Sequence, residues 1–293
     1  MKNINSQVKI VKINNKEYIE KTFNKKDKER YLKERDFYLF CNNNLIEHVP
    51  QLFHYDNTAH TLHIEKIEIL PPVKRINFEP ALIKLLKGLQ ELNCKDYPHY
   101  ANEAVTTETD IIHHIEVRYK NIRRSTFNSS MTGVNHKEAE SLLNKAASYE
   151  NKIKTEAFAL IPSPSDIGKH NLIKTRAGYF FIDFEYAGLD SYLKIIYDYV
   201  LHPKNFIKPE MHEKKINTLF KKLDLDKQFE KNIYGLFAIW WILRLKQSLS
   251  NETIKDRKDK GILTSYNINR YISERKNNIL FFHNLLSRNN LDA

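Results

Sequence analysis

Residues 1–70 alternate between hydrophobic and polar positions in the way that β-strands do. Two runs rich in β-branched and aromatic side chains, VKIVKI (8–13) and YIEKTF (18–23), flank the turn-forming NNKE. Two further runs, VPQLFHY (49–55) and TLHIEKIEIL (61–70), flank DNTAH, which is a second hairpin signal. The pattern predicts two hairpins of a small antiparallel sheet.

One helix is predicted between the two hairpins. Residues 26–44 place Tyr31, Phe37, Tyr38 and Cys41 among charged residues, and an Asn-rich run ends the segment. The first part of the chain is therefore expected to be a small sheet with one helix inserted after its early hairpin.

The periodicity becomes helical after Pro71 and Pro72, which cannot continue a strand ladder. Residues 78–92 and 136–153 have the spacing of amphipathic helices. Residues 229–249 are apolar nearly all round, so this helix is expected at the centre of a helical lobe, with its two tryptophans in the core.

Two short apolar runs, LIKT (172–175) and YFFIDF (179–184), interrupt the helices and predict a small hairpin. The fold class is therefore expected to be α+β and bilobal. A small antiparallel β lobe with one helix would occupy residues 1–70, and a larger, mostly helical lobe with the hairpin insert would occupy 71–293. Ligand sites commonly lie between two such lobes.

The composition narrows the class of protein. A hydrophobic fraction of 41% and an aromatic fraction of 12% in 293 residues are those of a folded chain. Two cysteines, Cys41 and Cys94, exclude a disulfide framework, and no Cys/His zinc spacing is present. The start has no signal-peptide pattern, and the longest apolar run, 233–243, is too short to span a bilayer. A reduced, cytoplasmic protein without a transmembrane segment is expected.

The net charge of +11 does not by itself indicate nucleic acid as a partner. A basic surface attracts nucleic acid, anionic lipid or phosphorylated small molecules alike. The densest basic run, residues 24–35, is punctuated by acids, as in a solvated helix face with internal ion pairs. The sequence has no recognised nucleic-acid module and no sustained basic stripe with interleaved aromatics. It therefore argues against a nucleic-acid-binding protein.

Candidate chemistry lies in IPSPSDIGKHN (161–171) and FIDFEYAG (181–188), which hold Asp166, Asn171 and Asp183. Phosphoryl transfer from ATP needs a carboxylate for the acceptor hydroxyl, oxygen ligands for Mg²⁺ and a cation for the phosphates. Ordinary turn chemistry explains the first two residues equally well, as a turn aspartate and a cap. The third is harder to explain in that way, because an unpaired buried carboxylate is costly.

The Asp-x-x-x-x-Asn spacing, followed by IDFE, resembles the aminoglycoside phosphotransferase and choline kinase family, which has the protein-kinase-like fold. The family pattern is His-Gly-Asp-x-x-x-x-Asn and then Ile-Asp-[Trp/Phe]-Glu. The resemblance implies that Asp166 is the catalytic base, Asn171 a metal ligand and Asp183 the principal metal ligand. The Ser-Pro-Ser-Asp form also resembles a branch of proteins associated with bacterial surface-polysaccharide loci, which favours a sugar-like substrate.

The resemblance extends to residues 1–70, the expected nucleotide-binding lobe. Lys21 matches the phosphate-binding lysine of the family, and Glu34 matches the helix glutamate that pairs with it, with Glu29 as the alternative. The run 61–70 would connect the lobes, and backbone groups near Glu65 and Ile67 would bond the adenine edge.

Three departures from the family pattern stand out. Pro164 and Ser165 replace His-Gly before the aspartate, so another group must support the loop, or the loop is altered. No Gly-rich loop precedes the first predicted strand, so the phosphates would be capped by Asn5, Ser6 and Gln7, and the family's first strand is expected to be short or absent. Lys194 stands where many relatives have an acid, and Asp198 is the nearby substitute.

The resemblance implies an ATP- and Mg²⁺-dependent phosphotransferase. It would transfer the γ-phosphoryl group to a hydroxyl of a small molecule, with a sugar or polysaccharide precursor among the candidate acceptors. The alternative is a catalytically inactive kinase-like protein that binds nucleotide or a partner in a regulatory role. The acceptor, the choice between ATP and GTP, and the oligomeric state stay open.

Overall fold

The computed structural model describes residues 6–71, 77–95, 97–150 and 158–288. Asn5 and Pro72 lie outside the described residues, as do the last three residues of the helix expected over 136–153. The chain forms two compact units, each built from several segments. The first consists of 1–104, 159–205 and 218–227, and the second of 105–158, 206–217 and 228–293. The expected division of roles at residue 70 stays a prediction.

The first unit contains a four-stranded antiparallel sheet in the order β1-β2-β4-β3. Its strands are β1 (Ser6–Ile13), β2 (Lys16–Phe23), β3 (Leu52–Asp56) and β4 (Thr61–Glu65). Asn14 and Asn15 join the first two strands, both with positive φ, which asparagine tolerates better than most residues. The first strand begins two residues before the predicted start, so Ser6 and Gln7 belong to a strand.

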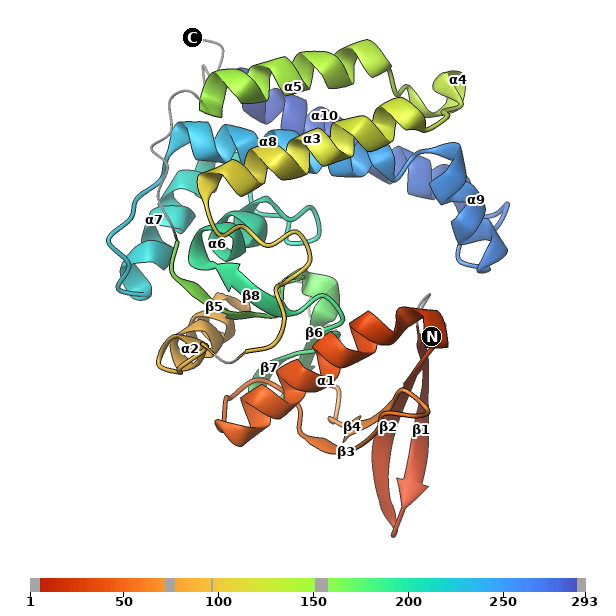
Figure 1. Ribbon diagram of the computed structural model, residues 1–293, viewed down its shortest axis with the longest axis vertical. Helices are drawn as coiled ribbons and strands as arrows, with labels where there is room; N and C mark the ends of the chain where they lie inside the picture. The colour runs from red at the N-terminus through yellow and green to blue at the C-terminus, as the bar shows by residue number, and fades with distance from the viewer. Residues whose placement is uncertain (1–5, 72–76, 96, 151–157, 289–293) are drawn as a thin grey trace. The chain divides into compact units, whose positions relative to one another are not determined.

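Helix α1 (Lys28–Asn43) follows the second strand, after a 3₁₀ turn at Lys25–Asp27. It contacts β2 and β3, and the ring of its buried Tyr31 lies 5.9 Å from that of Phe23 on β2. Phe37 and Tyr38 are also buried. Figure 1 shows the helix lying along the sheet. The single inserted helix predicted from the sequence is confirmed.

The rest of the first unit carries the stretches that hold the candidate chemistry. Its elements are α2 (Glu79–Gln90), β5 (Leu160–Ser163), a 3₁₀ turn (Lys169–Asn171), β6 (Leu172–Thr175), β7 (Gly178–Phe181), β8 (Gly188–Ser191) and α6 (Tyr192–Leu201). The sixth and seventh strands form the predicted hairpin, and the fifth pairs with the eighth. Gly188 is required by close packing, because a Cβ there would lie 2.2 Å from the backbone nitrogen of Ala101.

The second unit is helical. It contains α3 (Glu108–Arg124), α4 (Ser129–Thr132), α5 (His136–Glu150), α8 (Lys231–Gln247), α9 (Asn251–Asp259) and α10 (Ile268–Arg288). Helix α7 (His212–Lys222), preceded by a 3₁₀ turn at Pro209–Met211, runs from this unit into the first. Helix α8 is buried nearly throughout and contacts α3, α5 and α10, so its predicted central position is confirmed (Figure 1).

A small antiparallel sheet with a larger helical part confirms the predicted α+β class. Among the helices in the described ranges, none combines the length and the apolar character needed to cross a membrane.

Candidate active site

Lys21 joins the two halves of the predicted site within the first unit. Its Nζ lies 2.6 Å from Oε2 of Glu34 on α1 and 2.6 Å from Oδ1 of Asp183. Lys21 and Glu34 are buried, whereas the side chain of Asp183 is 30% exposed. Burial opposes the charge on Lys21, but the two carboxylates outweigh it and raise the pKa of the ammonium group. The cation is therefore fixed beside a carboxylate that still faces solvent.

The sequence left two glutamates as the partner of Lys21, and the packing of α1 distinguishes them. Glu34 lies three residues after Tyr31 and four before Tyr38, so it shares their buried helix face. Glu29 is 78% exposed and pairs with Lys33 at 3.0 Å. This signal was present in the sequence as the helical spacing of the aromatic residues.

The segment that follows β7 is held against α1 by successive side chains. The ring of Phe184 lies 4.5 Å from that of Phe37 and 4.9 Å from that of Tyr38. Glu185 lies 3.5 Å from Arg30, whose guanidinium also sits over the Tyr186 ring. Burial raises the pKa of Glu185, and the nearby Asp183 charge adds to that effect. These contacts fix the position of Asp183 relative to Lys21.

Asp183 and Asn171 are brought together by the hairpin between them. The N–H of Ile182 donates to the carbonyl of Asn171 at 3.0 Å, and Nδ2 of Asn171 donates to the carbonyl of Asp166 at 3.0 Å. Asp183 has φ +67°, a left-handed conformation that costs about 1 kcal/mol or more for a residue other than glycine. Such strain concentrates at functional sites.

Pro164 and Ser165 stand where the family pattern has a histidine and a glycine, and the hydroxyl of Ser163 supports the loop before Asp166. Ser165 adopts φ +63°, the conformation that glycine adopts freely, and its N–H donates to Oγ of the buried Ser163 at 2.9 Å. The N–H of Asp166 donates to the carbonyl of Pro164 at 2.8 Å. The altered Ser-Pro-Ser sequence therefore forms an ordered turn.

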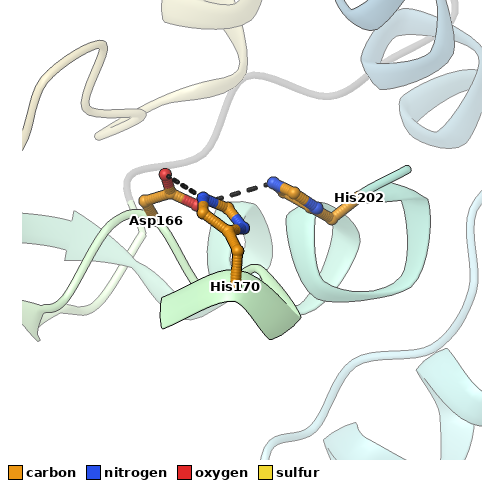
Figure 2. A group of neighbouring side chains, drawn as sticks. All are labelled: Asp166, His170 and His202. Carbon is orange, nitrogen blue, oxygen red and sulfur yellow. Dashed lines mark ion pairs between the residues drawn. The ribbon is translucent and has the colours of Figure 1, made fainter. Parts of the chain in front are cut away.

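Two histidines lie beside the Asp166 carboxylate (Figure 2). Nε2 of His170 lies 3.4 Å from Oδ2, and Nε2 of His202 lies 3.5 Å from Oδ1. Burial would raise the pKa of Asp166, but the two imidazoles outweigh it and hold the pKa well below its usual range. Asp166 is therefore ionised at neutral pH.

The two imidazole rings stack at a centroid distance of 5.5 Å, and a glycine makes room for them. A Cβ at Gly168 would lie 2.4 Å from Cε1 of His170 and 2.6 Å from Cε1 of His202. The sequence did not identify His202, because it lies beyond the hairpin and α6, and a histidine at the end of an apolar helix has no distinctive pattern.

Lys194, the third departure from the family pattern, belongs to a buried ion-pair cluster. Its Nζ lies 2.7 Å from Oδ2 of Asp190 and 3.5 Å from Oδ2 of Asp198. Burial opposes the lysine charge, but the two aspartates outweigh it and raise its pKa. The cluster joins the start of α6 to β8.

The remaining predicted residues lie on the sheet and its exit. Ser6 pairs with Phe23, so it shares the sheet face of Lys21, and its hydroxyl has no hydrogen-bond partner within the described part of the chain. The N–H of Glu65 is already bonded to the carbonyl of Gln51. Ile67 lies two residues beyond the end of β4, outside any strand.

Asn171 and Asp183 fit a Mg²⁺ ion in their chemistry. The Nδ2 group of Asn171 is bound to the loop, and the other amide atom is an oxygen. Asp183 adds a partly exposed carboxylate. Its Oδ1 is bound to Lys21, and its other oxygen is Oδ2. Carboxylate and amide oxygens are the ligands that Mg²⁺ prefers, with phosphates and waters completing the octahedron.

No protein-family model matches the sequence, and no curated protein does so either. Solved structures do match. A choline kinase from Cryptosporidium parvum is 13% identical, with a TM-score of 0.57, over 99% of this chain and 89% of that one. The choline kinase LicA from Streptococcus pneumoniae is 16% identical, with a TM-score of 0.55, over 96% and 90%. A spectinomycin phosphotransferase in complex with ADP and spectinomycin is 13% identical, with a TM-score of 0.59, over 96% and 89%.

The chain therefore has the kinase-like fold that choline kinases and aminoglycoside phosphotransferases share. The resemblance predicted from DIGKHN and IDFE is confirmed at the level of the fold, over nearly the whole chain.

Proposed function

We propose that this protein is a small-molecule kinase that transfers the γ-phosphoryl group of ATP to a hydroxyl. The observation that carries the proposal is the bridge from Lys21 to both Glu34 and Asp183, at 2.6 Å each. It joins the strand that would hold the phosphates to the carboxylate that would hold the metal. The bridge rests on residues far apart in sequence, so turn chemistry does not explain it.

Each proposed role follows from a position in the first unit. Lys21 neutralises charge on the α- and β-phosphates, and Glu34 keeps that lysine in place. Asn171 and Asp183 hold Mg²⁺, which neutralises phosphate charge when bound. Asp166 orients the acceptor hydroxyl and takes its proton. Ser6, on the sheet face of Lys21, contacts a phosphate, and backbone groups at Glu65 and Ile67 contact adenine.

The comparisons support a nucleotide and a small-molecule acceptor. One matching structure holds ADP with spectinomycin, and another, of LicA, holds AMP. Choline, ethanolamine and aminoglycosides are therefore the first acceptors to test. The sugar-like acceptor predicted from the Ser-Pro-Ser-Asp form has no support among these structures. The cytoplasmic location predicted from the sequence fits an ATP-dependent enzyme and is part of the proposal.

The alternative is an inactive kinase-like protein that binds nucleotide. Replacement of the family histidine by Pro164 favours it, and the bridge at Lys21 argues against it, because an inactive protein has no need to keep the complete set of charged residues. The two functions differ in one result, since an inactive protein binds ATP and never consumes it.

The test is consumption of Mg·ATP with each of choline, ethanolamine, spectinomycin, gentamicin and simple sugars. We expect one acceptor class to stimulate turnover, and Asp166→Asn to lower kcat roughly 10²-fold or more, because it loses the group that takes the proton. Asp224→Asn is the matched control, since Asp224 is 82% exposed and paired only with Lys87 at 3.3 Å among the ion pairs of the described residues. Nucleotide binding without turnover for every acceptor would favour the inactive alternative.

A further inference from the structure

We propose that His202 is a positioning residue for Asp166. Its imidazole holds Oδ1, so that Oδ2 is the oxygen that receives the proton of the acceptor hydroxyl. In this role His202 replaces the histidine that the family pattern has two residues before the aspartate, where this chain has Pro164. The role rests on the proposed phosphotransferase function, whereas the state of the imidazole described next does not.

The backbone around His202 fixes which ring nitrogen carries the proton. The N–H of Lys204 donates to Nδ1 of His202 at 3.1 Å. A nitrogen that accepts a hydrogen bond carries no proton, so a neutral imidazole must carry its proton on Nε2. Nε2 is the atom that lies 3.5 Å from Oδ1 of Asp166. His202 is therefore a neutral donor aimed at the carboxylate.

The ring has little freedom to leave this position. His202 caps the end of α6, where its N–H donates to the carbonyl of Asp198 at 2.8 Å. Its side chain is 11% exposed, and one face stacks on His170 above Gly168. Asp198 in turn lies in the buried cluster with Lys194, so the helix end is held from both directions.

The two carboxylate oxygens of Asp166 have different surroundings. Oδ1 faces His202 and also the N–H of Gly168, at 3.3 Å. Oδ2 faces only His170 among the ion pairs of the described residues, and His170 is 46% exposed. Figure 2 shows both imidazole rings beside the carboxylate, with a dashed ion-pair line for each. The acceptor therefore approaches Oδ2, where it competes only with an exposed side chain.

The proton transfer balances on these atoms. The acceptor O–H bond breaks, an Oδ2–H bond forms, and the acceptor oxygen forms a bond to the γ-phosphorus while the bond to the β–γ bridging oxygen breaks. The contacts of 3.3–3.5 Å are longer than ordinary hydrogen bonds. Contacts of this kind often tighten once substrate is bound.

The same three side chains would make a different site if they bound a metal. Their ligand atoms lie within 4.8 Å of one another. A transition metal on Nε2 of His202 would require that atom without its proton, and would move the proton to Nδ1, which already accepts the N–H of Lys204. The observed hydrogen bond from Lys204 therefore favours His202 as a hydrogen-bond donor to Asp166 over His202 as a metal ligand.

Nitrogen-15 NMR of the histidine rings in the full chain tests which ring nitrogen of His202 carries the proton. We expect His202, assigned by its loss in His202→Phe, to be neutral with its proton on Nε2 at neutral pH. A proton on Nδ1 would overturn the proposal. Equimolar Zn²⁺ should leave these resonances unchanged, and a Zn²⁺-dependent shift that disappears in His202→Phe would assign a metal site instead.

Carbon-13 NMR of the aspartate carboxyls tests the coupling to Asp166 without any nucleotide. His202→Phe keeps an aromatic ring against His170 but removes the donor, so the pKa of Asp166 should rise toward its usual range. His202→Gln restores an N–H donor and should reverse part of that rise. His99→Phe is the matched control, because His99 forms another His–Asp pair, 2.7 Å from Asp36. An unchanged Asp166 in His202→Phe would overturn the proposal.

Hydrolysis of Mg·ATP, with water as the acceptor, tests the catalytic consequence. We expect His202→Phe to lower kcat roughly 10²-fold with the KM for ATP unchanged, because the residue acts on the base and not on the nucleotide. His202→Gln should recover part of the loss, and His99→Phe should match the wild type. Equal losses in Phe and Gln variants would overturn the proposal. A wild type that neither binds nor hydrolyses ATP would refute the proposed function instead, while the two NMR results would still stand.

Discussion

The buried cluster of Lys194, Asp190 and Asp198 allows a sharp prediction about stability. Lys194→Met replaces the cation by an apolar side chain of similar length. The lysine side chain is 3% exposed, and those of Asp190 and Asp198 are 0% and 7% exposed. The substitution therefore leaves two carboxylates without their cation in a site from which water is excluded.

Removing one partner of a buried ion pair costs about 3–5 kcal/mol. At about 2–4 °C per kcal/mol for domains of this size, Tm should fall by roughly 6–20 °C. Lys9→Met is the matched control, because Lys9 pairs with Glu20 at the same distance of 2.7 Å but is 66% exposed. An exposed pair contributes little, so this variant should lie within about 0.5 kcal/mol of the wild type.

Thermal and urea unfolding of the three proteins, followed by circular dichroism, provide the measurement. Burial is the main difference between the two ion pairs. The argument that burial controls the strength of this cluster would be refuted by one result. That result is a loss of unfolding free energy in Lys194→Met below about 1 kcal/mol and equal to the loss in Lys9→Met.

Two further predictions concern other parts of the chain. Contacts of Glu138 with His283 and Lys246, each at 2.6 Å, lower the pKa of Glu138 to about 2 from its ordinary 4.5. A carboxyl group with a lowered pKa stabilises the fold at pH values above its ordinary pKa. This stabilisation is lost as the pH falls and the group becomes protonated. Glu138→Gln should therefore be less stable by about 1 kcal/mol at pH 7, after allowance for partial exposure. In Tm measurements the difference should shrink below about pH 4.5 and vanish as the pH falls through about 2. Phe184→Ala should cost about 3–5 kcal/mol in urea unfolding, because the fully buried ring leaves a cavity beside α1, and a cost below about 1 kcal/mol would contradict the packing described here.

Local patterns predicted the elements better than they predicted the site. The hairpin at 172–184 and the central helix at 229–249 were predictable because both are determined by short-range hydrophobic pattern. The start of β1 was not, because SQ has no strand propensity of its own and is ordered by pairing with Thr22 and Phe23.

The site residues divide in the same way. Asp166, Asn171 and Asp183 lie close in sequence and follow a spacing that can be recognised. Lys21 became informative only through its order relative to that set. His202 comes from the end of a helix beyond the hairpin, and its relation to Asp166 depends on the path of α6, which no local pattern encodes.

The most direct test of the central claim is the thermal stability of the protein with a non-hydrolysable ATP analogue, with and without Mg²⁺. A ligand that binds only the native state stabilises it by about 2.7 kcal/mol at a hundredfold excess over Kd. We predict a Mg²⁺-dependent rise in Tm for the wild type and for the surface control Asp224→Ala, and no Mg²⁺-dependent rise for Asp183→Ala relative to its own baseline. The absence of any rise in the wild type at saturating nucleotide would contradict the assignment of this site to Mg·ATP.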